Sequence, residues 1–231
     1  MQPLLLLHGA LGAASGFEAL TSELQSQFDV HTLDFPGHGG QPFPETAFSM
    51  PLFADSVLQY MDGQGLDSVS IFGYSMGGYV ALYLALRHPG RVRSIATLAT
   101  KMQWDPETAA RETGGLNPDT ILAKVPRFAE MLQKRHHPQD WKELLSQTAG
   151  LMRGLGDAPP LTDEVLQKVE QPVLMMRGDR DAMVTLEETV SAYKSLPNAS
   201  LAILPGTPHP LEKVNIPVLG TLVRSFFASA G

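Results

Sequence analysis

The sequence predicts an α/β protein, with a mostly parallel sheet of about six strands flanked by helices. Short, nearly continuous apolar runs recur along the 231 residues, as expected of strands buried on both faces of a sheet. Helical patterns separate these runs, and this alternation favours parallel strands joined by right-handed crossovers. The predicted strands are Pro3–Leu7, Phe28–Leu33, Ser68–Phe72, Ser94–Leu98, Pro172–Met176 and Ala199–Leu204.

Three helices around the sheet have clear signals. The segment Tyr79–Leu86 is apolar on nearly every side, so we expect a buried helix that ends at Pro89-Gly90. A capping box, Thr185–Glu188, begins a later helix. The amphipathic stretch from Val218 to Phe227 predicts the last helix.

The alternation of strands and helices stops after the fourth strand. From about residue 101 to residue 161 the chain has helix signals and no strand candidate. We therefore expect residues 101–165 to form an inserted helical cap. Residues 1–100 and 166–231 then form the α/β core.

Helix starts within this insertion follow from capping side chains and prolines. Asp105–Glu107 and Asn117–Asp119 each combine a capping residue, a proline and an acid, the order typical of a helix N-terminus. Pro126 should break or kink the second helix. A further helix is predicted from near Pro138 to Gly154.

Composition excludes several classes of function. The net charge is −7, and Lys and Arg form no cluster, so nucleic acid is not expected as a partner. No apolar run approaches the length of a membrane span, and no signal peptide begins the chain, so we expect no membrane partner and a cytoplasmic location. The sequence has no cysteine, so any nucleophile must be another residue type. It indicates no oligomeric state.

The segment Gly73-Tyr74-Ser75-Met76-Gly77 follows the third predicted strand and precedes the buried helix. This GxSxG pattern between a strand and a helix predicts a sharp turn that exposes the serine hydroxyl. Side chains two residues before or after the serine would collide in such a turn, and glycine avoids the collision. Ser75 is therefore the candidate nucleophile.

A serine nucleophile needs a base, and the base needs an orienting acid. In a parallel sheet, functional groups collect in the loops after the carboxyl ends of the strands. The loop after the fifth strand contains Asp179 and Asp181, and the loop after the sixth contains His209. The chain order of serine, acid and histidine is that of elbow serine hydrolases.

With these segments the chain resembles the α/β-hydrolase superfamily, in its lidded, esterase-like branch. The resemblance also includes Leu7–Gly12 and Asp34–Gly39, the turns after the first two strands. It implies an α/β-hydrolase fold and a catalytic triad of Ser75, His209 and Asp181, because family members place the acid in a Gly-x-x-Asp pattern. Asp179 is then expected to shape the turn.

The resemblance also implies an oxyanion hole made by the backbone amides of Met76 and Ala10. Residues near the ends of the same strands are candidates for substrate contact. Lys101 is expected either to meet a substrate carboxylate or to lie on the surface. Candidate substrate contacts are Leu11, Tyr74, Lys101 and Trp104.

These features predict a cofactor-independent serine hydrolase that cleaves a small carboxylic ester, or a thioester, through an acyl-enzyme. Two alternatives remain open. One is a carbon–carbon hydrolase or a lyase of the menaquinone-pathway kind, which keeps the same triad. The other is a small-ligand receptor with vestigial activity. The pair His136-His137 has no third metal ligand at a suitable spacing, so we expect a solvated helix end and assign no metal.

Overall fold

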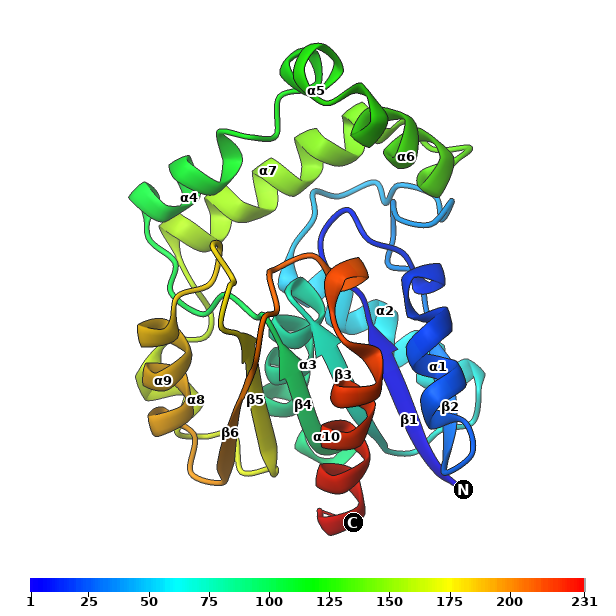
Figure 1. Ribbon diagram of the computed structural model, residues 1–231, viewed down its shortest axis with the longest axis vertical. Helices are drawn as coiled ribbons and strands as arrows, with labels where there is room; N and C mark the ends of the chain where they lie inside the picture. The colour runs from blue at the N-terminus through cyan, green and yellow to red at the C-terminus, as the bar shows by residue number, and fades with distance from the viewer. Residues whose placement is uncertain (231) are drawn as a thin grey trace.

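The computed structural model describes residues 1–230 and contains one six-stranded sheet (Figure 1). Every neighbouring pair of strands is parallel, in the order β2-β1-β3-β4-β5-β6. The predicted α/β class is confirmed, and the sheet is parallel throughout. The strands are β1 Gln2–Leu7, β2 Phe28–Thr32, β3 Val69–Tyr74, β4 Val92–Leu98, β5 Val173–Gly178 and β6 Ala199–Leu204.

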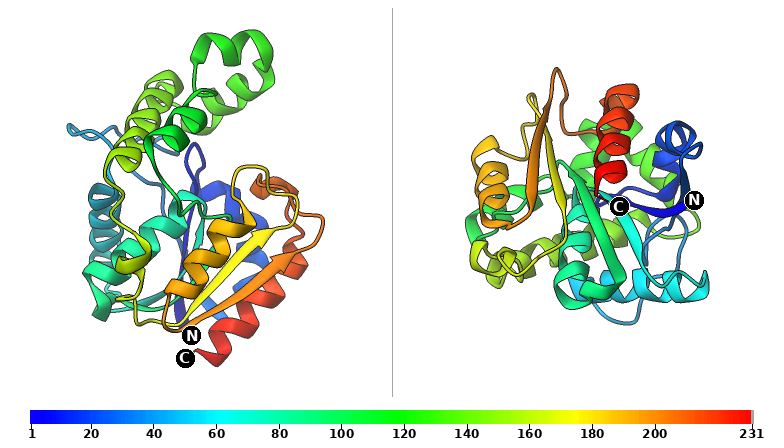
Figure 2. Two further views of the ribbon diagram at one scale, coloured as in Figure 1. Left: turned by 90° about the vertical axis from the view of Figure 1, so that its left-hand side faces the viewer. Right: turned by 90° about the horizontal axis from the view of Figure 1, so that it is seen from below.

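Helices cover both faces of the sheet because successive strand residues point to opposite sides. In β1, Leu4 and Leu6 pack in one apolar cluster, while Leu5 and Leu7 pack in another. Helices α1 and α10 lie over the first face, and α2, α3 and α9 over the second, as the view from below shows (Figure 2). Their bounds are α1 Glu18–Leu24, α2 Met50–Gly63, α3 Met76–Arg87, α8 Asp163–Leu166, α9 Leu186–Ser195 and α10 Ile216–Ser229, with short 3₁₀ turns at Ala14–Phe17, Pro89–Arg91 and Leu211–Lys213.

Four further helices lie beyond the carboxyl ends of the strands (Figures 1 and 2). Three of them, α5, α6 and α7, share a small apolar core of their own, in which Leu132 and Trp141 are buried. This layer comprises α4 Pro106–Thr113, α5 Pro118–Lys124, α6 Pro126–His136 and α7 Trp141–Asp157. It falls inside the segment 101–165 that we propose as the cap.

Helix boundaries in this layer differ from the prediction at two points. Helix α7 begins at Trp141 rather than near Pro138, because the Asp140 side chain caps it by accepting from the Lys142 amide at 2.9 Å. It continues through Gly154 to Asp157, since its buried face extends beyond that glycine to Leu155. Pro126 separates α5 from α6, as predicted.

No helix within residues 1–230 is both long enough and apolar enough to cross a lipid bilayer.

Candidate active site

Ser75 occupies a strained turn between β3 and α3. Its backbone has φ 52° and ψ −117°, a region that L-residues enter only when the surrounding structure enforces it. Two neighbours on β4 and its following loop hold it there. The Ser75 amide donates to the Leu98 carbonyl at 2.8 Å, and the Thr100 hydroxyl donates to the Ser75 carbonyl at 3.0 Å.

The turn has no room for a side chain at either Gly73 or Gly77. A Cβ atom at Gly73 would overlap the Gly78 backbone, and one at Gly77 would overlap the carbonyl of Leu7. Helix α3 therefore starts within van der Waals distance of β1, and its first amides lie next to the loop that leaves β1.

Asp181 and His209 meet at the carboxyl ends of β5 and β6. His209 Nδ1 lies 2.8 Å from Asp181 Oδ2. The other carboxylate oxygen, Oδ1, accepts from the amides of Met183 and Val184, both at 2.9 Å. Burial alone would raise the pKa of Asp181, but these hydrogen bonds outweigh it and hold the pKa below its usual value. Asp181 is therefore ionised at neutral pH.

Asp179 lies in the same loop and has another partner. Its Oδ1 accepts from the Thr207 amide at 3.0 Å, which joins the acid loop to the histidine loop. The buried Arg177 guanidinium holds the acid loop from inside, with donors 2.8 Å from the carbonyls of Val184 and Asp181. The sequence does not point to Arg177, because an arginine inside a strand gives no signal of what it binds.

The amides of Ala10 and Met76 donate no hydrogen bond within residues 1–230. Met76 is the first residue of α3, where an amide has no partner inside the helix. His8 shapes the turn that carries Ala10. Its Nε2 accepts from the Phe35 amide at 3.2 Å, so Nδ1 carries the proton and donates to the Gly9 carbonyl at 2.8 Å.

Helix α6 is attached to the same turn through the carbonyl of Leu11, a residue with φ 59°. Arg135 Nη1 donates to this carbonyl at 3.0 Å, and His136 Nε2 does so at 3.1 Å. His136 Nδ1 accepts from the Gly39 amide at 3.0 Å, which fixes the tautomer. Leu11 thus contacts the helical layer above the sheet.

The expectation that His136 lies at a solvated helix end is wrong, because its side chain is fully buried. The signal was present in the sequence. Ala129, Leu132 and His136 follow the three-and-four spacing of one helix face, and all three are buried. His137, which follows the helix, is exposed.

His8, His38 and His136 form a buried cluster of imidazole rings. The ring centres of His8 and His38 are 5.0 Å apart, and those of His38 and His136 are 5.8 Å apart. Burial lowers the pKa of both His8 and His136 to about 4, and it lowers the pKa of His38 well below its usual value. All three are neutral at pH 7.

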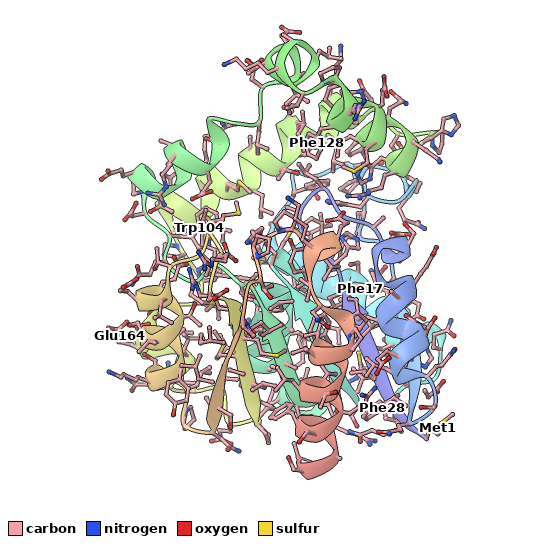
Figure 3. All side chains as sticks on the ribbon, in the orientation of Figure 1. Met1, Phe17, Phe28, Trp104, Phe128 and Glu164 are labelled. Atoms are coloured by element: carbon pink, nitrogen blue, oxygen red, sulfur yellow. The ribbon has the colours of Figure 1, made fainter. Side chains whose placement is uncertain are left out.

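A pocket with about 440 Å³ of empty space, part of it open to solvent, lies between Ser75 and α7. Its walls are mainly apolar side chains. Trp104 lines it and lies between α4 and the sheet (Figure 3). The lining residues are Ala10, Met50, Ser75, Met76, Tyr79, Lys101, Trp104, Leu151, Met152, Leu155 and Met183.

Two of the four candidate substrate contacts, Trp104 and Lys101, line this pocket, whereas Tyr74 and Leu11 lie outside its lining. The Tyr74 hydroxyl donates to the His209 carbonyl at 2.9 Å. Burial raises the pKa of Tyr74, so the phenol keeps the proton that it donates. Tyr74 is thus in direct contact with the histidine backbone.

The alternative that placed Lys101 on the surface is wrong, because its side chain is only 7% exposed. Its Nζ lies 3.3 Å from Glu188 Oε2 and 3.7 Å from Glu112 Oε1, and it donates to the Met183 carbonyl at 3.1 Å. The sequence could not indicate this, since Glu188 lies 87 positions along the chain from Lys101.

Among residues 1–230, no three His, Asp or Glu side chains are arranged to hold a metal ion.

Comparison with known proteins identifies the fold and the family. A family model described as the alpha/beta hydrolase fold matches residues 2–132. A pimeloyl-[acyl-carrier protein] methyl ester esterase of Neisseria meningitidis is 28% identical, over 96% of this chain and 91% of that protein.

Two solved structures have the same fold. A thermophilic esterase from Thermogutta terrifontis has a TM-score of 0.78 at 21% identity, covering 100% of this chain and 90% of that one. A meta-cleavage product hydrolase from Pseudomonas fluorescens has a TM-score of 0.85 at 20% identity, covering 100% and 92%. Since the family model matches more than half of the residues, the chain belongs to the α/β-hydrolase family.

Proposed function

We propose that this chain is a serine hydrolase that cleaves a small carboxylic ester through an acyl-enzyme. One observation carries the proposal. An ionised Asp181 lies 2.8 Å from Nδ1 of His209, on the same edge of the sheet as a strained serine that lines a pocket. Such a pair is the arrangement that turns a serine hydroxyl into a nucleophile.

In the proposed reaction, the Ser75 hydroxyl attacks the ester carbonyl while His209 Nε2 accepts its proton. Asp181 keeps the imidazole proton on Nδ1 and stabilises the imidazolium. The carbonyl oxygen becomes negative and binds to the amides of Ala10 and Met76, which have no other acceptor. His209 then protonates the leaving alcohol. Water repeats the sequence on the acyl-enzyme and releases the acid.

The named relatives support ester cleavage in particular. The Neisseria protein is, by its name, an esterase for the methyl ester of pimeloyl-acyl carrier protein, and it aligns with nearly the whole chain. An ester with a small alcohol is therefore the substrate class that we propose. A thioester would follow the same route, and a carbon–carbon hydrolase would need an additional step to protonate a carbon. The two solved structures are 21% and 20% identical to this chain, so they support the fold and favour neither reaction.

The test is reaction with a fluorophosphonate probe and with a series of p-nitrophenyl esters of increasing acyl length. We expect one label on Ser75 and turnover of at least one ester. Ser75→Ala should lower kcat by about 10⁴- to 10⁶-fold. Ser22→Ala changes an exposed serine on α1 and should leave both readouts unchanged.

Absence of both labelling and turnover in the wild-type protein would refute the hydrolase proposal and favour the receptor alternative. Labelling with turnover only of thioesters would retain the mechanism and change the substrate class.

A further inference from the structure

The pocket beside Ser75 contains one ammonium group, on Lys101, and this group is already neutralised. Glu188 and Glu112 lie 3.3 and 3.7 Å from Lys101 Nζ, and their side chains are 2% and 10% exposed. The three side chains together carry one more negative than positive charge. A negative cluster of this kind repels a carboxylate rather than binding it.

Each member of this cluster comes from a different part of the fold. Lys101 follows β4, Glu112 belongs to α4 in the proposed cap, and Glu188 belongs to the first turn of α9. Glu188 is further fixed by the amides of Met102 and Thr185, both 3.0 Å away. The ammonium is therefore held against its partners and is not free to turn toward a substrate.

The remaining groups on the pocket wall do not change the net negative charge of this cluster. Apart from Ser75, Lys101 and the Tyr79 phenol, the lining side chains are Ala, Met, Leu and Trp. The Tyr79 hydroxyl accepts from the Leu161 amide at 3.2 Å. Arg111 contacts Glu112 at 3.2 Å, but its side chain is 59% exposed, so water screens its charge.

We propose that the Lys101–Glu112–Glu188 cluster determines specificity by excluding carboxylates from this pocket, so that the substrate group that enters it is uncharged and apolar. The inference rests on the proposed ester hydrolase function and narrows its substrate class. An acyl chain that ends in a free carboxylate would have to leave water near the buried Glu188 carboxylate and the 10% exposed Glu112 carboxylate, with no unpaired cation nearby. A chain of the same length that ends in a methyl group has no such cost.

The experiment compares p-nitrophenyl hexanoate with the p-nitrophenyl monoester of adipic acid, which differs by a terminal carboxylate. We expect wild-type kcat/KM to favour the hexanoate by roughly 100-fold or more. Glu112→Gln removes one negative charge beside Lys101 and should reduce that ratio about tenfold. Glu107→Gln removes the same charge from an exposed position in the first turn of α4 and should leave the ratio unchanged.

A binding measurement separates this inference from the proposed function. In Ser75→Ala, the indole N–H resonance of Trp104 reports on the pocket, because Nε1 donates to the Lys101 carbonyl. Methyl hexanoate should shift this resonance at lower concentration than monomethyl adipate does.

The outcomes are distinct. Equal kcat/KM for the two esters, or a ratio that Glu112→Gln leaves unchanged, would overturn the inference while the hydrolase proposal stands. No fluorophosphonate labelling and no turnover of any ester, with selective binding of methyl hexanoate, would refute the hydrolase proposal alone. The same absence of activity with equal binding, or with no binding, would refute both.

Discussion

Asp181 uses its two carboxylate oxygens for separate tasks. Oδ2 lies next to His209 Nδ1, and Oδ1 accepts hydrogen bonds from the amides of Met183 and Val184, in the loop that leads to α9. Asp179 has no contact with the histidine side chain and joins the two loops through Thr207. In the sequence, only a family pattern favours Asp181 over Asp179 as the triad acid. The structure adds a physical reason, because the Asp181 carboxylate contacts the His209 imidazole and the Asp179 carboxylate contacts the Thr207 amide.

We predict that Asp181→Asn lowers kcat by about 10⁴-fold, because an amide cannot stabilise the imidazolium and favours the wrong tautomer. Esters that turn over in the wild type provide the measurement. Asp179→Asn serves as the matched control and should lower kcat by less than about tenfold. Equal losses in the two variants would contradict the assignment of Asp181.

At the scale of elements, helix α6 and the turn after β1 behave as one unit. Arg135 and His136 both donate to the Leu11 carbonyl, and Arg135 also contacts Glu212 at 3.0 Å. Leu11 follows Ala10, whose amide is proposed to bind the oxyanion. The orientation of that amide therefore depends on the position of the helix.

Arg135→Met should lower kcat by roughly tenfold with a smaller change in KM, because an oxyanion donor contributes more in the transition state than in the ground state. Lys134→Met, at the exposed neighbouring position, is the control. A change in KM alone would indicate that Arg135 contacts substrate instead. Loss of activity in both variants would indicate damage to α6.

The strands were predictable because each is a short apolar run between turn residues, and five of the six predicted strands begin within one residue of the observed position. Helix α7 was less predictable. Asp140 and Pro138 are both plausible starting residues, and only the capping hydrogen bond to Lys142 distinguishes them. Helix α2, at Met50–Gly63, is not among the helices that we predict from the sequence, although Ser49 caps it and a proline lies in its first turn.

Ser75, Asp181 and His209 were candidates because a strand end followed by a loop is visible in the sequence. The cluster around Lys101 is not visible in the sequence, since it depends on the ion pair with Glu188, 87 positions away. Local patterns give no information about which distant carboxylate approaches a lysine. For the same reason the charge of the pocket could be evaluated only in three dimensions.

For the whole molecule, the buried histidine cluster makes stability depend on pH. His136 has a folded pKa of about 4 and an ordinary value of 6.5. Between these values the unfolded chain binds a proton that the folded chain does not, so stability falls as pH decreases from 6.5 toward 4. His136 alone should contribute about 2 to 3 kcal/mol to this fall.

His136→Asn should therefore flatten the pH dependence of the unfolding free energy below pH 6.5, measured by urea denaturation from pH 8 to pH 4.5. Leu132→Ala, on the same buried face of α6, should lower stability by about 2–5 kcal/mol at every pH and keep the slope. An unchanged slope in His136→Asn would contradict the assignment.

The strained backbone conformation that exposes the Ser75 hydroxyl lowers the stability of the protein. A residue at φ 52° costs roughly 1–3 kcal/mol unless it is glycine. Ser75→Gly should therefore have an unfolding free energy about 1 kcal/mol higher than that of Ser75→Ala in urea denaturation, although both lack the hydroxyl. Selection for thermal resistance alone would accumulate glycine at this position and produce a more durable but inactive protein. A screen for stabilised variants of this chain must therefore also require turnover.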